Sequence, residues 1–240
     1  MHQSKMNHQV VSLKPLAVAA VFSVAMASTT VMAVSVTPGM TTNLTGTTAL
    51  AEPDLVGTVI RDQLLPFQIA DNLGNVLVQG NVQDRVVRST NTGELIFAPR
   101  LRDLSNPSSV AWISGFSMSD YSGFSTDINY HLDGLGDVGP NAVTRSAATG
   151  ADLYYRFDPN LIVPNDESYF LSVFTDAENY DLSGLFTIYA QNDFGAGFYS
   201  TTIEGVAAPS PVPLPAAAWL FATGLAGLIG VMRRKQNEDA

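Results

Sequence analysis

LLPFQIADNLGNVLVQG, residues 64–80, holds two short apolar runs on either side of a turn-forming segment. The runs, Leu64–Ala70 and Val76–Gly80, have the length and the apolar, partly β-branched composition of β-strands. Between them, Asp71–Asn75 contains Asn and Gly residues, which tolerate the positive φ angles of tight turns. The stretch therefore predicts a β-hairpin and favours an all-β fold.

The same alternation of short apolar runs with Gly, Pro, Asn and Asp continues along most of the chain. A second hairpin turn is predicted at Asn91–Gly93, and residues 34–206 show no helical pattern of apolar residues longer than two turns. Eight or more short strands at this spacing predict a β-sandwich of the jelly-roll type. The predicted strands are Leu55–Ile60, Leu64–Ala70, Val76–Gly80, Val82–Arg88, Glu94–Pro99, Val110–Met118, Ile128–Leu132, Asp152–Phe157, Tyr169–Thr175, Leu185–Ala190 and Phe198–Ile203.

The C-terminal end has the order of a stop-transfer segment. A proline-rich stretch, residues 211–215, precedes an apolar run, Ala216–Met232, and the basic cluster Arg233-Arg234-Lys235 follows at once. Lys and Arg are retained on the cytoplasmic side, so this order predicts one transmembrane helix with a cytoplasmic tail at 236–240. The run has 17 residues, about 25 Å as a helix, against a hydrocarbon core of about 30 Å. A permanent single-span anchor and a transient anchor both fit.

The motif Val212-Pro213-Leu214-Pro215-Ala216, with the apolar run and Arg233-Arg234-Lys235, resembles a PEP-CTERM sorting signal. It is similar to the variant written Val-Pro-Leu-Pro-Ala in place of Pro-Glu-Pro, and the resemblance covers about 25 terminal residues. It implies recognition by an exosortase-like membrane processing enzyme of Gram-negative bacteria that make exopolysaccharide. It also implies cleavage near the proline motif, after which the body of the protein reaches the cell surface or the extracellular matrix.

The N-terminal residues 1–33 have the parts of a secretory signal peptide. Lys5 and Lys14 provide a basic start without acidic residues, an apolar stretch runs from Leu16 to Ala27, and small residues lead to Ala33. We expect signal peptidase to cleave after Ala33, with Ala27 as the second choice. An uncleaved N-terminal anchor is the alternative.

Between these signals lies an acidic, cysteine-free body. Residues 34–208 contain twenty acidic residues, seven arginines and no lysine, a formal charge of −13. This charge repels phosphate and argues against nucleic acid or anionic membrane surfaces as partners. The absence of Cys excludes disulfides, thiolate metal sites and Cys nucleophiles. We expect a Ser/Thr-rich lead-in or first edge strand at 34–54, the β-sandwich at 55–206, a Pro-rich linker at 207–211 and the sorting signal at 212–235.

Few residues of the body suggest catalysis. His131 is the only histidine beyond the signal peptide, and a lone His in a strand-like run is more often a surface residue than a general base. Gly115-Phe116-Ser117-Met118-Ser119 matches a nucleophile elbow only as far as its serine. Zinc sites built from two or three His are excluded by count. The sequence predicts a protein that is not an enzyme.

Carboxylates in glycine-containing loops are the candidates for a metal. Asp133 and Asp137 stand four residues apart around Gly134 and Gly136, as in loops that bind calcium. Solvated turns are the alternative for this pair and for the acidic residues at 166–167 and 176–181. Paired carboxylates also serve glycosidases, but the sequence does not fix their separation. We predict no certain cofactor and regard structural calcium at Asp133 and Asp137 as the candidate.

Aromatic residues are frequent in the second half of the body, and in a sandwich most of them fill the core. Trp112 and any exposed tyrosine remain available to stack on sugar rings. The sequence thus predicts an exported envelope protein that acts as a structural or adhesive component of an exopolysaccharide or biofilm matrix. A carbohydrate-binding module and a secreted polysaccharide hydrolase are the alternatives.

Overall fold

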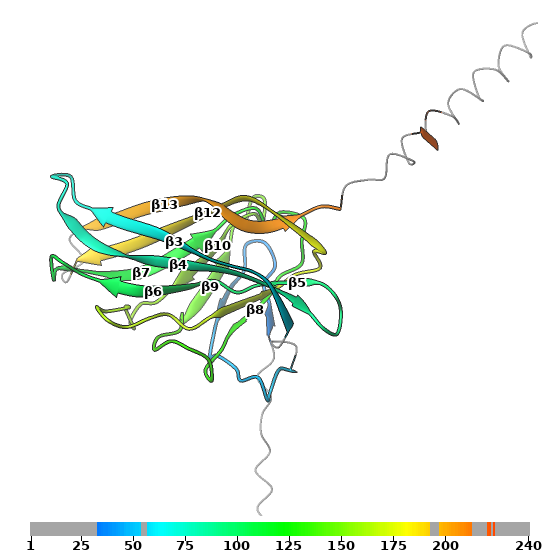
Figure 1. The fold of residues 1–240 in the computed structure, drawn as a ribbon, viewed down its shortest axis with the longest axis horizontal. Helices are drawn as coiled ribbons and strands as arrows, with labels where there is room; N and C mark the ends of the chain where they lie inside the picture. Colours follow the sequence, from blue (N-terminus) through cyan, green and yellow to red (C-terminus); the bar gives the residue numbers. More distant parts are fainter. Residues whose placement is uncertain (1–32, 54–56, 193–196, 213–219, 222, 224–240) are drawn as a thin grey trace, which may run out of the picture.

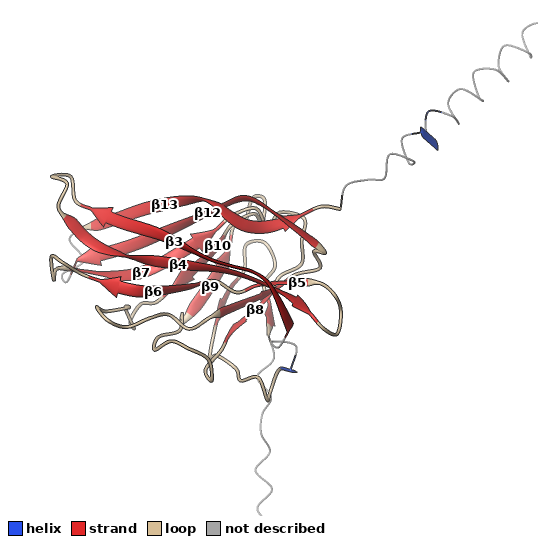
Figure 2. Ribbon diagram, in the orientation of Figure 1, coloured by secondary structure: helices blue, strands red, loops and turns tan. Residues whose placement is uncertain are grey.

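The computed structural model describes residues 33–53, 57–192, 197–212, 220, 221 and 223. The β-strands among these residues pair into two antiparallel sheets, as Figures 1 and 2 show. The signal peptide up to residue 32, the span 216–232 apart from three residues, and the tail 236–240 lie outside the described residues. The strands are β1 (Val34–Ser35), β2 (Thr41–Asn43), β3 (Gly57–Ala70), β4 (Val76–Ser89), β5 (Leu95–Phe97), β6 (Arg100–Ser105), β7 (Ala111–Met118), β8 (Asp127–Tyr130), β9 (Ala142–Arg145), β10 (Leu153–Arg156), β11 (Leu171–Phe174), β12 (Asn179–Asn192) and β13 (Phe198–Ser210).

We name the two sheets A and B. Sheet A has the strand order β1-β8-β11-β5-β4-β3, with β6 also paired to β4, and sheet B has the order β13-β12-β7-β10-β9-β2. Three antiparallel pairs are nested along the chain, namely β9 with β10, β8 with β11 and β7 with β12. The innermost and outermost of these pairs lie in sheet B and the middle pair in sheet A. The chain therefore passes repeatedly from one sheet to the other.

The two sheets share one hydrophobic core, as in β-sandwiches. Sheet A contributes residues such as Val86 and Leu171, and sheet B contributes an aromatic group around Phe116. The ring of Phe116 lies 4.7 Å from Phe186, 5.0 Å from Tyr155 and 5.7 Å from Phe157, measured between centroids. The all-β prediction is confirmed, with two antiparallel sheets.

The hairpin at 64–80 is confirmed, and its strands are longer than predicted. The Asp71 carboxylate accepts hydrogen bonds from the backbone N–H groups of Leu73 and Asn75, both at 2.8 Å, and Gly74 has φ 85°. The predicted break around residues 61–63 is wrong, because β3 continues there and its charged side chains pair across to β4. The ion pairs are Arg61–Asp84 at 2.6 Å and Arg85–Asp62 at 2.7 Å.

The β domain extends further at both ends than its predicted borders. The segment 34–54 was predicted to be a lead-in or a first edge strand, and it supplies the edge strands β1 and β2 and places Val36 and Leu44 in the core. The predicted linker at 207–211 is wrong up to Ser210, because these residues complete β13. Ala207 is buried, and its N–H donates to the Asp84 carboxylate at 3.2 Å. The ordered domain therefore extends from the predicted signal cleavage site almost to the predicted sorting motif.

A buried arginine holds several loops to sheet B. Arg145 is the last residue of β9 and is 4% exposed. Its guanidinium donates hydrogen bonds to backbone carbonyls and one hydroxyl rather than to a carboxylate. Its bonds run from Nε to Gly150 O (2.8 Å), from Nη1 to Val36 O (3.1 Å) and Thr126 Oγ1 (3.0 Å), and from Nη2 to Tyr121 O (2.8 Å) and Phe124 O (2.8 Å). One side chain thus connects the N-terminal segment, the loop after β7 and the turn after β9.

Candidate functional site

A row of hydroxyl side chains crosses all six strands of sheet B on its outer face. Each member is the cross-strand partner of the next, in the order Thr41, Thr144, Tyr154, Ser117, Thr187 and Thr202. Each strand contributes one residue, in the order β2, β9, β10, β7, β12 and β13. We call these six residues the hydroxyl row.

The alternation of side chains along each strand turns this row away from the core. Ser117 lies between Phe116 and Met118, which are both buried in the core, and Thr187 lies between the buried Phe186 and Ile188. On β10, Leu153 and Tyr155 are likewise buried on either side of Tyr154. The apolar residues that form the core therefore also fix the outward direction of the hydroxyl row.

Side-chain hydrogen bonds hold the row in place. Thr41 Oγ1 and Thr144 Oγ1 are 2.8 Å apart, and Thr187 Oγ1 and Thr202 Oγ1 are 2.9 Å apart. A hydroxyl has one donor and two acceptor lone pairs, so each bonded pair keeps one donor and three lone pairs for a ligand. The row is thus held in a defined arrangement and still offers both donors and acceptors.

Four aromatic side chains lie on the same face. Tyr154, within the row, is 42% exposed, and Phe198 at the start of β13 is 77% exposed. Tyr189 points outward because Ile188 and Ala190 are buried, and its hydroxyl lies 3.1 Å from Ser117 Oγ. Trp112 points outward in the same way, between two buried residues of β7. Of the candidate sugar-stacking residues, Trp112 and the outward tyrosines thus share one face.

Gly115 lies beside this aromatic group and is buried. It pairs with Arg156 on one side and with Tyr189 on the other. A Cβ atom at this position would lie 2.5 Å from the carbonyl oxygen of Tyr155, so the backbone of β10 excludes a larger residue. The close approach of β7 and β10 therefore requires glycine at this position.

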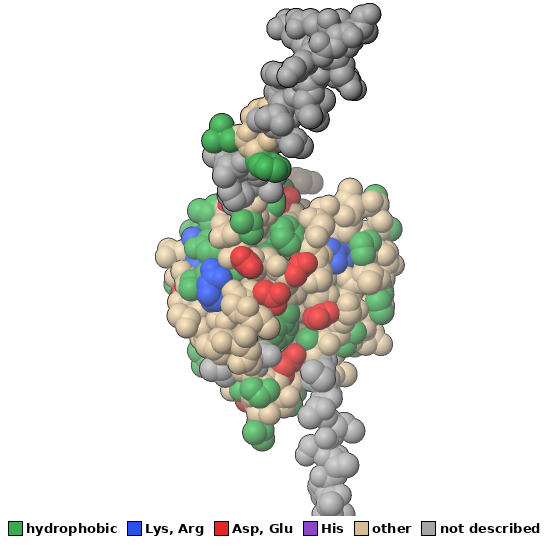
Figure 3. All heavy atoms as spheres, turned by 90° about the vertical axis from the view of Figure 1, so that its right-hand side faces the viewer, with side chains coloured by type: hydrophobic (Ala, Val, Ile, Leu, Met, Phe, Trp, Pro, Cys, Tyr) green, Lys and Arg blue, Asp and Glu red, His purple; other side chains and the backbone are tan. Residues whose placement is uncertain are grey.

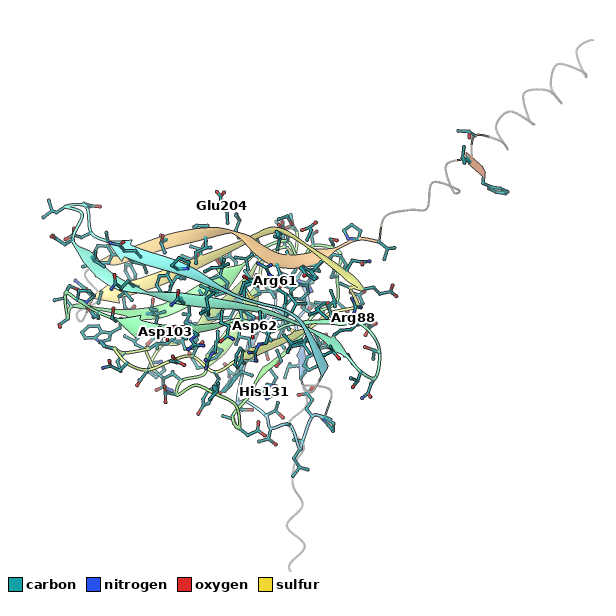
Figure 4. The ribbon with its side chains drawn as sticks, in the orientation of Figure 1. Arg61, Asp62, Arg88, Asp103, His131 and Glu204 are labelled. Atoms are coloured by element: carbon teal, nitrogen blue, oxygen red, sulfur yellow. The ribbon has the colours of Figure 1, made fainter. Side chains whose placement is uncertain are left out.

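The hydroxyl row has no ionised member. Partial burial raises the pKa of Tyr154 above its ordinary value, and Asp152 and Tyr189 add to the increase, so this hydroxyl remains protonated at neutral pH. Charged side chains flank the row, with Arg156 on β10 and Glu204 on β13. Figure 4 shows Glu204 projecting from β13 away from the body of the domain. The six row positions are therefore uncharged, whereas Asp152 and Arg156 near the middle of the row and Glu204 on β13 place charges beside it.

This face brings together hydroxyl groups and aromatic rings, and His131 does not lie on it. Ser117 of the elbow-like segment bonds to Tyr189, and His131 lies just after β8, a strand of sheet A. A serine nucleophile needs a neighbouring base, and the structure does not bring these two predicted residues together. Hydroxyls and aromatic rings on a flat sheet can instead hold a polyhydroxylated ligand by hydrogen bonds and stacking.

His131 lines a separate pocket of about 360 Å³ on sheet A. Val87, Ile96 and Phe170 give this pocket an apolar lining, and the Arg85 guanidinium lies 4.1 Å from the centroid of Phe170. Burial lowers the pKa of His131 below its ordinary value, and the Asp133 carboxylate partly offsets this effect. Among the described residues that line the pocket there is no Asp or Glu, so the carboxylate pair of a glycosidase is not found there.

The two carboxylates of the candidate calcium site bind different backbone groups. Asp133 accepts from the Ala49 N–H at 3.0 Å and lies 3.6 Å from His131 Nδ1, while Asp137 accepts from the Glu167 N–H at 2.9 Å. In the described part of the chain, no group of three or more His, Asp and Glu side chains is placed to hold a metal ion. The calcium site stays a prediction.

The predicted processing residues lie at the edges of the described chain. Ala33 is described, and its N–H donates to Glu52 Oε1 at 3.1 Å. Val212 is exposed, whereas Pro213, Leu214, Pro215, Arg233, Arg234 and Lys235 lie outside the described residues. Within the residues that the structure describes, no helix has the length and apolar character needed to cross a membrane.

No protein-family model, curated protein or solved structure matches the chain. The hydroxyl row was not identified from the sequence, because its members are separated by up to 161 positions, from Thr41 to Thr202. The only local signal is a pair of hydroxyl residues at alternate positions, such as Ser117 and Ser119 or Thr187 and Tyr189. This signal gains meaning only when the register of six strands is known.

Proposed function

We propose that the protein is exported, is cut at both ends, and then serves as a structural or adhesive component of an extracellular polysaccharide matrix. Signal peptidase acts after Ala33, and an exosortase-like enzyme acts near Val212–Pro215. The observation that carries this proposal is the position of both sites at the borders of the ordered domain. Val34 is the first residue of β1, and Ser210 is the last residue of β13.

Processing enzymes need an accessible, extended chain, and the end of β13 supplies one. Ser210 is still paired with Asn179 of β12, while Pro211 and Val212 are exposed. In Figure 1 the chain leaves the domain at the end of β13 and does not pack back onto the sheets up to residue 212. A cut beyond Val212 therefore removes no residue of either sheet, and the released body keeps its core.

The nested strand pairs support a finer description of the fold. Nested antiparallel pairs that alternate between two sheets are the basis of jelly rolls. The pairs β9–β10, β8–β11 and β7–β12 follow this plan. We therefore describe the domain as a jelly-roll-like β-sandwich in which β13 extends sheet B beyond β12.

Replacing Arg233, Arg234 and Lys235 by Gln tests the C-terminal processing. The stop-transfer charges are lost, so we expect most of the protein to keep its C-terminus, whereas the wild type ends near Pro215. Intact mass of the protein from cell-surface and medium fractions of a host with the processing enzyme distinguishes the two forms. Pro211→Ala, outside the four-residue motif, is the matched control and should be processed normally. A wild-type mass that runs from Val34 to Ala240 would show a permanent anchor and refute the proposal.

A further inference from the structure

We propose that the hydroxyl row and the aromatic side chains beside it bind an uncharged polysaccharide that lies across the strands of sheet B. The proposed matrix role gives this surface its biological setting, and the inference rests on that role. Neither the sorting motif nor the fold class specifies the ligand. The ligand class follows from four properties of the face, namely its hydroxyl groups, its length, its aromatic side chains and its charge.

The hydroxyl groups match the chemistry of a sugar chain. Every sugar ring presents several hydroxyls that both donate and accept hydrogen bonds. A serine, threonine or tyrosine hydroxyl can act as the acceptor or the donor for them, because its hydrogen can rotate. The pairs Thr41–Thr144 and Thr187–Thr202 are already bonded to each other, so their orientation costs little on binding. Ionised side chains would instead favour an ionic ligand, and none of the six row positions carries one.

The length of the row suits a polymer rather than a single sugar. Neighbouring strands lie about 4.8 Å apart, so six strands give a row of about 24 Å. Ser117 is buried and its hydroxyl bonds to Tyr189, so the accessible contacts lie on the strands on either side of β7. A chain of linked, similar units can satisfy these contacts in turn. The described pockets of the domain lie elsewhere, and their linings contain none of the six row residues.

The aromatic side chains supply stacking at the middle of the row. Tyr154 offers an exposed ring, and Tyr189 lies on the same face, where it pairs with Gly115 of β7. The C–H groups on the face of a sugar ring carry slight positive charge and contact the negative face of an aromatic ring favourably. Tyr189 is also fixed by its hydrogen bond to Ser117. A sugar unit at this point can therefore stack without reordering the site.

The charge of the domain excludes the anionic polymers. Residues 34–208 carry a formal charge of −13, and Figure 3 shows several acidic side chains on the end of the molecule from which the chain leaves. Beside the row itself, Asp152 and Glu204 carry negative charge and Arg156 carries positive charge. An anionic polysaccharide would be repelled by this field, and a second copy of this acidic chain would be repelled as well. An uncharged polysaccharide avoids the repulsion.

Affinity electrophoresis of the full-length protein in mild detergent tests the proposal. Native gels contain hydroxyethylcellulose or dextran as uncharged probes, or alginate as the anionic probe. We expect at least one uncharged polymer to retard the protein and alginate not to. Tyr154→Ala should weaken retardation about tenfold, Tyr154→Phe much less, and Thr187→Val about threefold. Leu64→Ala, a similarly exposed residue of β3, is the matched control and should bind like the wild type.

Urea midpoints equal to that of the wild type establish that each variant is folded. Retardation by none of the polymers, equal retardation by alginate, or binding unaffected by Tyr154→Ala would each overturn the proposal. A dimer that is seen by light scattering and lost in Tyr154→Ala would assign the face to a second copy instead. The assay does not depend on processing, so a protein that is cut normally but fails to bind refutes this inference alone. A protein that binds but is never cut refutes the sorting proposal alone.

Discussion

Arg145→Ala is expected to lower the free energy of unfolding by about 3–5 kcal/mol. The guanidinium donates to four backbone carbonyls and to the Thr126 hydroxyl within a buried site. Alanine removes all these donors at once. The carbonyls of Val36 and Tyr121 keep a second donor, whereas those of Gly150 and Phe124 lose the arginine, and a buried group left unpaired costs about 1–3 kcal/mol unless water reaches it. Total stabilities of about 5–15 kcal/mol make this loss large.

Urea unfolding followed by tryptophan fluorescence measures the effect of Arg145→Ala. Arg145→Lys keeps the charge but has three donors on a flexible stem, so we expect it to recover only part of the loss. Arg156→Ala removes an exposed arginine from the neighbouring strand and is the matched control, with a change within about 0.5 kcal/mol. Equal midpoints for Arg145→Ala and Arg156→Ala would show that the buried arginine does not hold the loops together.

Phe116→Ala is expected to cost about 3–5 kcal/mol of unfolding free energy. Phe116 is fully buried and contacts three other rings, those of Phe186, Tyr155 and Phe157. Removing its ring loses both the burial of the side chain and the stacking, and leaves a cavity that rigid neighbouring strands cannot close.

Thermal unfolding by circular dichroism checks this second expectation. Phe198→Ala removes the same side chain from a position that is 77% exposed, so its melting temperature should remain close to that of the wild type. Phe116→Leu keeps much of the side-chain volume, so its melting temperature should lie between those of Phe116→Ala and Phe198→Ala. If Phe116→Ala and Phe198→Ala have the same melting temperature, the aromatic group at the centre of sheet B is not a major source of stability.

The sequence predicted the parts of this fold that depend on local chemistry. Asp71 and Gly74 specify their turn through their own side chain and backbone, so the hairpin at 64–80 was predicted correctly. The polar stretch at 61–63 looked like a loop because its partners, Asp84 and Arg85, lie on the next strand. Charges that pair across strands do not appear in the apolar pattern of a single segment.

The end of the domain shows the same limit. Residues 207–211, Ala-Ala-Pro-Ser-Pro, have the composition of a linker. In the structure, Ala207 and Ala208 are buried, because small side chains fit where β13 approaches the core and Asp84. The hydroxyl row lay beyond sequence reasoning for a related reason, since it exists only through the pairing register of six strands.

The attachment of β13 has a mechanical consequence. It is an edge strand of sheet B, and its pairing with β12 extends from Phe198 to Ser210, next to the point where the chain leaves the domain. Tension on the chain beyond Val212 acts along the strand axis and loads these ladder hydrogen bonds in shear, many at a time. A strand pulled from its side would instead release its bonds one after another. The direction of exit therefore makes the last strand resistant to force at the end where the protein would be held.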